Sequence, residues 1–116
     1  MAKDDYHVVV YQILSNLYVC LKKGEQLDES LLTGERLFGI KEDYRKYILY
    51  NLLKDGYITG FEAEQSTYID GTAYIKIGSL KNCQITPKGI EYLSDNSFMK
   101  KAMEFFKDVK NIIPFV

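Results

Sequence analysis

Two junctions between a helical pattern and an extended pattern constrain the fold of this chain most. The stretch LLKDGYITG, residues 52–60, ends a helical pattern at Gly56 and continues at once with residues that favour strands. The stretch QITPKGIEYL, residues 84–93, does the reverse, because Thr86 is a preferred N-cap and Pro87 suits the first turn of a helix. A hairpin between these junctions is therefore expected to join one set of helices to another.

Three helical segments are predicted before the first junction. Residues 6–23 repeat apolar side chains at helical spacing, and Gly24 follows where a C-terminal cap glycine belongs. A shorter segment, residues 29–37, follows the N-cap candidate Asp28. Residues 41–55 form the third helical segment, whose apolar positions indicate one face turned to a core.

The region between the junctions predicts a β-hairpin. An Asp-Gly pair at positions 70 and 71 separates two runs rich in strand-forming residues, which is a hairpin signal. Residues 57–62 and residues 73–77 are the expected antiparallel partners, and residues 67–69 are either a further strand or a loop. This order predicts an α+β, mainly α fold: a winged helix-turn-helix whose hairpin is the wing and whose third helix is the groove reader.

The last predicted element is an amphipathic helix over residues 97–113, capped by Asn96 or Ser97. Its apolar seam steps by four and three residues, close to a heptad, through Phe98, Ala102, Phe105, Val109 and Ile112. Two interpretations stay open: the seam packs on the first helix of the same domain, or it builds a homodimer interface. The predicted organisation is one domain, residues 1–116, with a winged-helix core over residues 1–93 and the added C-terminal helix.

Composition and motifs argue against several classes of protein. No apolar run approaches the ~18 residues of a membrane span, so we expect no membrane insertion and a cytoplasmic location. Cys20 and Cys83 lack metal-ligand or redox spacing. His7 is the single histidine, and no phosphate-binding loop or zinc-protease motif occurs. We therefore expect no metal, no cofactor, no catalytic residues and no enzymatic activity.

The junction sequences also carry a family resemblance. LLKDGYITG, followed by ITPKGIEYLSDNSFMKKAMEFFKDVKNIIPF, resembles the YjcQ-like family of small winged-helix proteins from Gram-positive bacteria and their phages. The resemblance covers nearly the whole chain and implies a winged-helix fold with a DNA-binding role. It supplies no catalytic or ligand residues. The hypothesis from the fold and the resemblance together is a protein of bacterial or prophage origin that controls transcription through its third helix.

Local charge divides the chain, although the net charge is only −1. Residues 36–54 hold five basic against two acidic side chains, which suits a helix that approaches phosphates. Residues 55–75 hold four acidic side chains and no basic one, which a phosphate backbone would repel. The candidates for contact with double-stranded DNA are Lys41, Arg45, Lys46, Tyr47, Tyr50 and Lys54.

A protein-interaction module of the same fold is the alternative function. An acidic wing beside a helix rich in Tyr and basic residues suits a protein partner about as well as DNA. The six candidates are otherwise an ordinary solvated helix face. Exposed cations on the third helix would favour DNA, whereas Glu62, Glu64 and Asp70 on the same surface would favour a protein partner.

Overall fold

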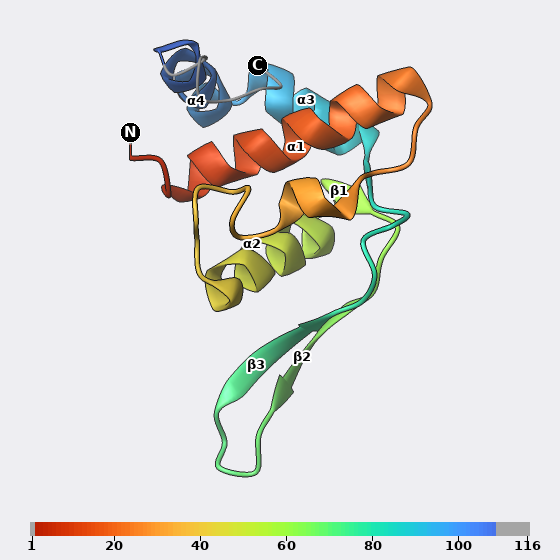
Figure 1. The fold of residues 1–116 in the computed structure, drawn as a ribbon, viewed down its shortest axis with the longest axis vertical. Coiled ribbons are helices and arrows are strands. Elements are labelled where there is room, and N and C mark those ends of the chain that lie inside the picture. Colours follow the sequence, from red (N-terminus) through yellow and green to blue (C-terminus); the bar gives the residue numbers. More distant parts are fainter. Residues whose placement is uncertain (1, 109–116) are drawn as a thin grey trace.

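The computed structural model describes residues 2–108, and it confirms a mainly helical α+β fold consistent with a winged helix (Figure 1). The elements in chain order are α1 (Tyr6–Lys23), the 3-10 helix η1 (Glu29–Leu32), α2 (Glu42–Lys54), β1 (Ile58–Thr59), β2 (Ala63–Thr67), β3 (Ala73–Ile77), β4 (Gln84–Ile85), α3 (Pro87–Asp95) and α4 (Ser97–Asp108). Residues 63–77, which form the β2–β3 hairpin, are called the arm, and the other described elements are called the body. In Figure 1 the arm extends from the body below α2.

Helix α1 is the centre of the body. Its buried side chains fall on more than one side of the helix, and they include Val8, Val9, Val10, Ile13, Leu14 and Leu17. Helices α3 and α4 lie against one side of α1, and α2 lies on the other (Figure 1). Gly24 ends α1 with a φ of 67°, a left-handed conformation that favours glycine, so the predicted end of this helix is confirmed.

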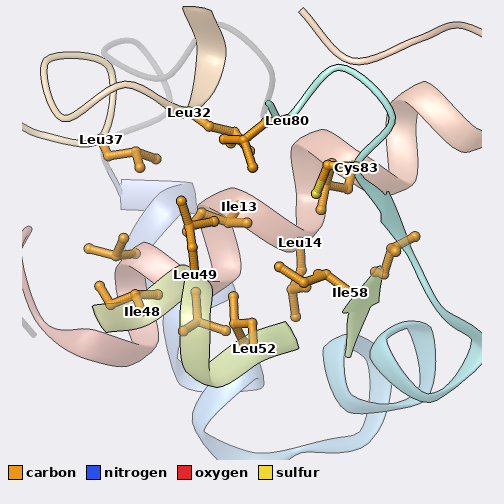
Figure 2. Close-up of a cluster of buried hydrophobic side chains, with 14 of the residues drawn as sticks. Ile13, Leu14, Leu32, Leu37, Ile48, Leu49, Leu52, Ile58, Leu80 and Cys83 are labelled. Carbon is orange, nitrogen blue, oxygen red and sulfur yellow. The ribbon is translucent and has the colours of Figure 1, made fainter. Parts of the chain in front are cut away.

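The core forms where α1, α2 and the loops beside them meet. From α2 the residues Ile48, Leu49 and Leu52 are buried, as the helical pattern predicted. Figure 2 shows them with Ile13, Leu14, Leu32, Leu37, Ile58, Leu80 and Cys83. Both cysteines are free thiols, and burial raises the pKa of Cys83 to about 12. Cys83 therefore behaves as a small apolar core residue.

The two sequence junctions are bonded to each other. Strand β1 pairs antiparallel with β4, and Ile58 lies opposite Ile85. The Thr86 hydroxyl donates a hydrogen bond to the Gly56 carbonyl (2.6 Å) and accepts one from the Gly89 N–H (3.0 Å). Thr86 thus caps α3, as predicted, and ties the end of α2 to the start of α3.

The predicted partners of the hairpin were wrong. Strand β3 pairs with residues 63–67, not with residues 57–62, so that Thr67 faces Ala73 and Ala63 faces Ile77. Thr67 ends β2, and residues 68 and 69 lie in the turn. The Asp-Gly turn was placed correctly, but the extended run before it is broken at Gly60. Gly60 has a φ of 94°, and a Cβ there would lie 1.9 Å from the Asn82 carbonyl oxygen.

Helix α4 packs on α1 and α3 within the same chain. Asn96 is its cap, because the Asn96 Oδ1 accepts hydrogen bonds from the N–H groups of Phe98 (2.9 Å) and Met99 (3.3 Å). The buried stripe of α4 is Met99, Ala102 and Phe106.

The buried stripe is rotated relative to the predicted seam. Ala102 belongs to both, whereas Phe98 is 45% exposed and Phe105 is half-buried. Val109 and Ile112 lie outside the described residues. The intramolecular packing of α4 accounts for part of its apolar surface, and the homodimer stays a prediction.

No helix within residues 2–108 is both long and apolar enough to cross a membrane.

Candidate nucleic-acid interface

Five of the six predicted contact residues lie on α2 and the sixth, Lys41, is its N-cap residue, but they are not equally exposed. Lys41 and Lys54 are exposed, and Tyr47 is 53% exposed. Lys46 and Tyr50 are half-buried. The face of α2 that is open to solvent therefore carries cations near both ends and a tyrosine between them.

Arg45 is used inside the protein. Its side chain is only 15% exposed, and its Nη1 forms an ion pair with the Glu42 carboxylate at 2.6 Å. Its Nε donates a hydrogen bond to the Leu32 carbonyl at the end of η1. These contacts fasten η1 to the first turn of α2, and they use two of the five N–H donors of the guanidinium. The sequence grouped Arg45 with the candidate DNA contacts and gave no sign of this role.

The arm lies beside α2 and adds acidic groups to the same surface. Glu62 and Glu64 line a hollow together with Leu53 of α2. Asp70 lies at the tip of the arm, where its Oδ1 accepts a hydrogen bond from the Thr72 N–H (2.9 Å). This hydrogen bond lowers the pKa of Asp70, so the tip carries a negative charge at neutral pH. Exposed cations, which favour DNA, and the acidic residues Glu62 and Glu64, which favour a protein partner, are therefore both present beside α2.

Sequence analysis missed a tyrosine cluster at the junction of α1, α2 and α3. The rings of Tyr57 and Tyr92 are 4.5 Å apart, and the Lys88 Nζ lies 5.0 Å from the Tyr57 ring centre. The same Nζ donates to the Asp55 carbonyl (2.7 Å), and burial raises the pKa of nearby Tyr6 to about 12. The cluster comes from segments far apart in the chain, so no local pattern could have revealed it.

His7 takes part in the contact between α1 and α4. Its ring stacks on the ring of Phe98 with a centroid distance of 4.2 Å and an interplanar angle of 7°. Burial lowers the pKa of His7, and its buried Nδ1 has no hydrogen-bond partner among the described residues. Within residues 2–108, no group of three or more His, Cys, Asp or Glu side chains could hold a metal ion.

Helix α2 runs directly into β1 of the β1–β4 ladder, and the β2–β3 hairpin follows. This order of elements defines a protein of the winged-helix class. The chain belongs to the YjcQ family, because the family model described as YjcQ protein matches residues 11–112. Neither a curated protein nor a solved structure matched the chain.

Proposed function

We propose that this protein binds double-stranded DNA through α2 and acts as a transcriptional regulator of bacterial or prophage origin. Its role is binding rather than catalysis. The observation that supports DNA binding is the solvent face of α2, which carries Lys46, Tyr47 and Lys54 in the position that winged-helix proteins use to enter the major groove.

The spacing of the two lysines suits the dimensions of a duplex. Lys46 and Lys54 are eight residues apart, so their Cα atoms are separated by ~12 Å along the helix axis. A recognition helix lies in the major groove, so two lysines spaced along its axis can reach separate phosphates of the backbone. Tyr47, which directly follows Lys46 and has an exposed ring, would face the groove.

Fluorescence anisotropy with a mixed pool of duplex DNA tests this proposal at about 50 mM and about 200 mM salt. Each phosphate contact contributes about −0.9 to the slope of log K against log salt. We expect wild-type binding to weaken at the higher salt concentration. A Lys46→Glu, Lys54→Glu variant is expected to lose the binding, because both phosphate contacts become repulsive.

The matched control is a Lys81→Glu, Lys100→Glu variant, which has the same change in net charge at exposed positions away from α2. We expect this control to keep most of the affinity of the wild type. Equal loss in both variants would mean that only the overall charge matters, and this would contradict a role for α2. Absence of wild-type binding at the lower salt concentration would favour the alternative function, a protein-interaction module.

A further inference from the structure

Two hollows are lined by residues of α2 and of the arm or its base, and together they are called the groove. The arm itself extends below α2 in Figure 1. The larger hollow has a volume of about 650 Å³. The apolar side chains of this hollow come from α2, from the chain entering β2 and from β3, and they are Leu53, Phe61, Ala63 and Ile77. The side chains of Leu53, Phe61 and Ile77 are only partly buried, so the floor of the hollow is open to a partner.

A smaller hollow of about 280 Å³ continues the groove toward the tip of the arm. Tyr47 of α2 and Tyr68 of the arm both line it, and they are 53% and 59% exposed. The ring of Tyr68 stacks on that of Tyr74 at 4.3 Å, and Ile69 beside it is fully exposed. Exposed aromatic and apolar side chains gathered at one groove are typical of protein interfaces.

The charge of the groove selects the kind of partner. Glu62 and Glu64 lie at the larger hollow, and neither forms a salt bridge within residues 2–108. Lys76 lies opposite Glu64 in the strand register and is the single cation of this hollow. Over both hollows the groove holds three acidic residues, Asp43, Glu62 and Glu64, against Lys46 and Lys76. This small excess of negative charge disfavours a phosphate backbone and attracts a cation.

We propose that the groove between α2 and the arm docks a protein segment in which a Lys or Arg is flanked by apolar residues. The aliphatic stem of the cation packs on Leu53, Phe61 and Ile77, while its charged end reaches Glu62 and Glu64. The apolar neighbours of the cation pack against Tyr47 and Tyr68 in the smaller hollow. This inference goes beyond DNA binding by α2, and the two proposals share Tyr47, which lines the smaller hollow.

A random-peptide library displayed on phage is the probe, selected against the immobilised full chain. Selected peptides are then synthesised with a fluorescent label and titrated by anisotropy. We expect them to share a Lys or Arg flanked by apolar residues. A Glu62→Gln, Glu64→Gln variant is expected to raise the Kd about tenfold or more, because two charge-assisted contacts lose their charge.

The matched control is a Glu25→Gln, Glu91→Gln variant, which makes the same charge change at exposed positions outside the groove. It is expected to bind the peptides like the wild type. Methyl and aromatic NMR signals of Leu53, Phe61 and Ile77 are expected to shift when peptide is added. Circular dichroism checks that both variants keep the fold.

Four results would overturn the inference. The first is a selection that yields no binder or no motif with a Lys or Arg among apolar residues. The second is a Glu62→Gln, Glu64→Gln variant that binds as tightly as the wild type. The third is duplex DNA that shifts the same NMR signals, which would assign the groove to nucleic acid. The fourth is a dimer in sedimentation that dissociates in this variant, which would assign the groove to a second copy of the chain.

Discussion

The body and the arm differ in how they are held together. In the body, α1 alone buries eight residues, and Leu52 of α2 and Phe106 of α4 are 1% and 0% exposed. In the arm, no residue of β2 or β3 is fully buried. The arm is held by its own strand ladder and by partly buried side chains such as Ile77. The body therefore depends on buried packing for its stability, whereas most side chains of the arm are not required for packing.

This difference explains how the arm can carry acidic and aromatic side chains such as Glu64, Tyr68 and Asp70 at open positions. A carboxylate such as Glu64 would be costly in the core of the body, where it would lose its hydration. In the arm it stays exposed, and it costs little until a partner covers it. Changes in the body are therefore expected to lower the free energy of unfolding more than changes in the arm.

The largest effect is expected for Phe106→Ala in the body. The Phe106 ring lies 5.1 Å from the ring of Tyr11 and 5.9 Å from that of Phe38, and it is fully buried. Its removal should lower the free energy of unfolding by about 3–5 kcal/mol. Phe105→Ala is the matched control, and its half-buried ring should cost only about 1 kcal/mol. Urea unfolding measures both, and a reversed order would place the wrong face of α4 in the core.

A smaller effect is expected from the titration of His7. Burial lowers its pKa below the ordinary 6.5, so the unfolded chain takes up a proton at a higher pH than the folded chain. The stabilisation from neutral His7 is therefore complete above pH 6.5, and it is lost as the pH falls through 6.5 toward the folded pKa. Asp5 opposes this shift through its charge.

Urea unfolding at pH 7.5 and pH 5.5, with His7→Gln as the control, measures this contribution. The wild type should lose more stability on acidification than the variant, because the variant lacks the titrating ring. The difference between them should be smaller than the loss caused by Phe106→Ala. Identical pH dependence in the two proteins would show that burial of the His7 ring does not lower its pKa in the folded chain.

The smallest effect is expected in the arm. Ile69 is fully exposed at the turn, so Ile69→Ser should change the free energy of unfolding by no more than about 0.5 kcal/mol. A loss of 2 kcal/mol or more, of the order expected in the core, would mean that the tip packs on something in solution. A second copy of the chain would then be detected by light scattering.

Local signals were enough to predict α1, α2, α3 and α4, but the helical segment predicted over residues 29–37 was too long, because only Glu29–Leu32 forms a 3-10 helix and turns follow it. Gly24 and Thr86 mark helix boundaries because a glycine cap and a hydroxyl cap act on neighbouring backbone groups. The strand pairing failed because it depends on register and on the break at Gly60, where the Asn82 carbonyl approaches from twenty-two residues away. A contact between residues so far apart in the chain cannot be predicted from a short window of sequence.

The six candidate contact residues lie on α2 or at its N-cap, and their contact with DNA stays a prediction, whereas the structural role of each side chain was less predictable. The core-facing stripe of α4 differs from the predicted seam, because Phe105 and Phe106 both fit a heptad-like spacing and contacts with the rings of Tyr11 and Phe38 place Phe106 in the core. Arg45 was grouped with the exposed cations because nothing in the sequence indicates that the Leu32 carbonyl lies within its reach. Both errors concern contacts between distant segments.

The neck of the arm, where Glu62 and Gly78 meet, has a consequence for how proteins of this family can diverge. The N–H of Gly78 donates to the Glu62 carbonyl (2.8 Å), so the chain leaves the body and returns to it at nearly one point. Residues can be added to or removed from the hairpin in facing pairs without moving either end of this neck. Doubling the length of such a loop costs only about 0.6 kcal/mol in closure entropy. The arm can therefore lengthen, shorten or change its surface while the helices beneath it keep the same sequence constraints.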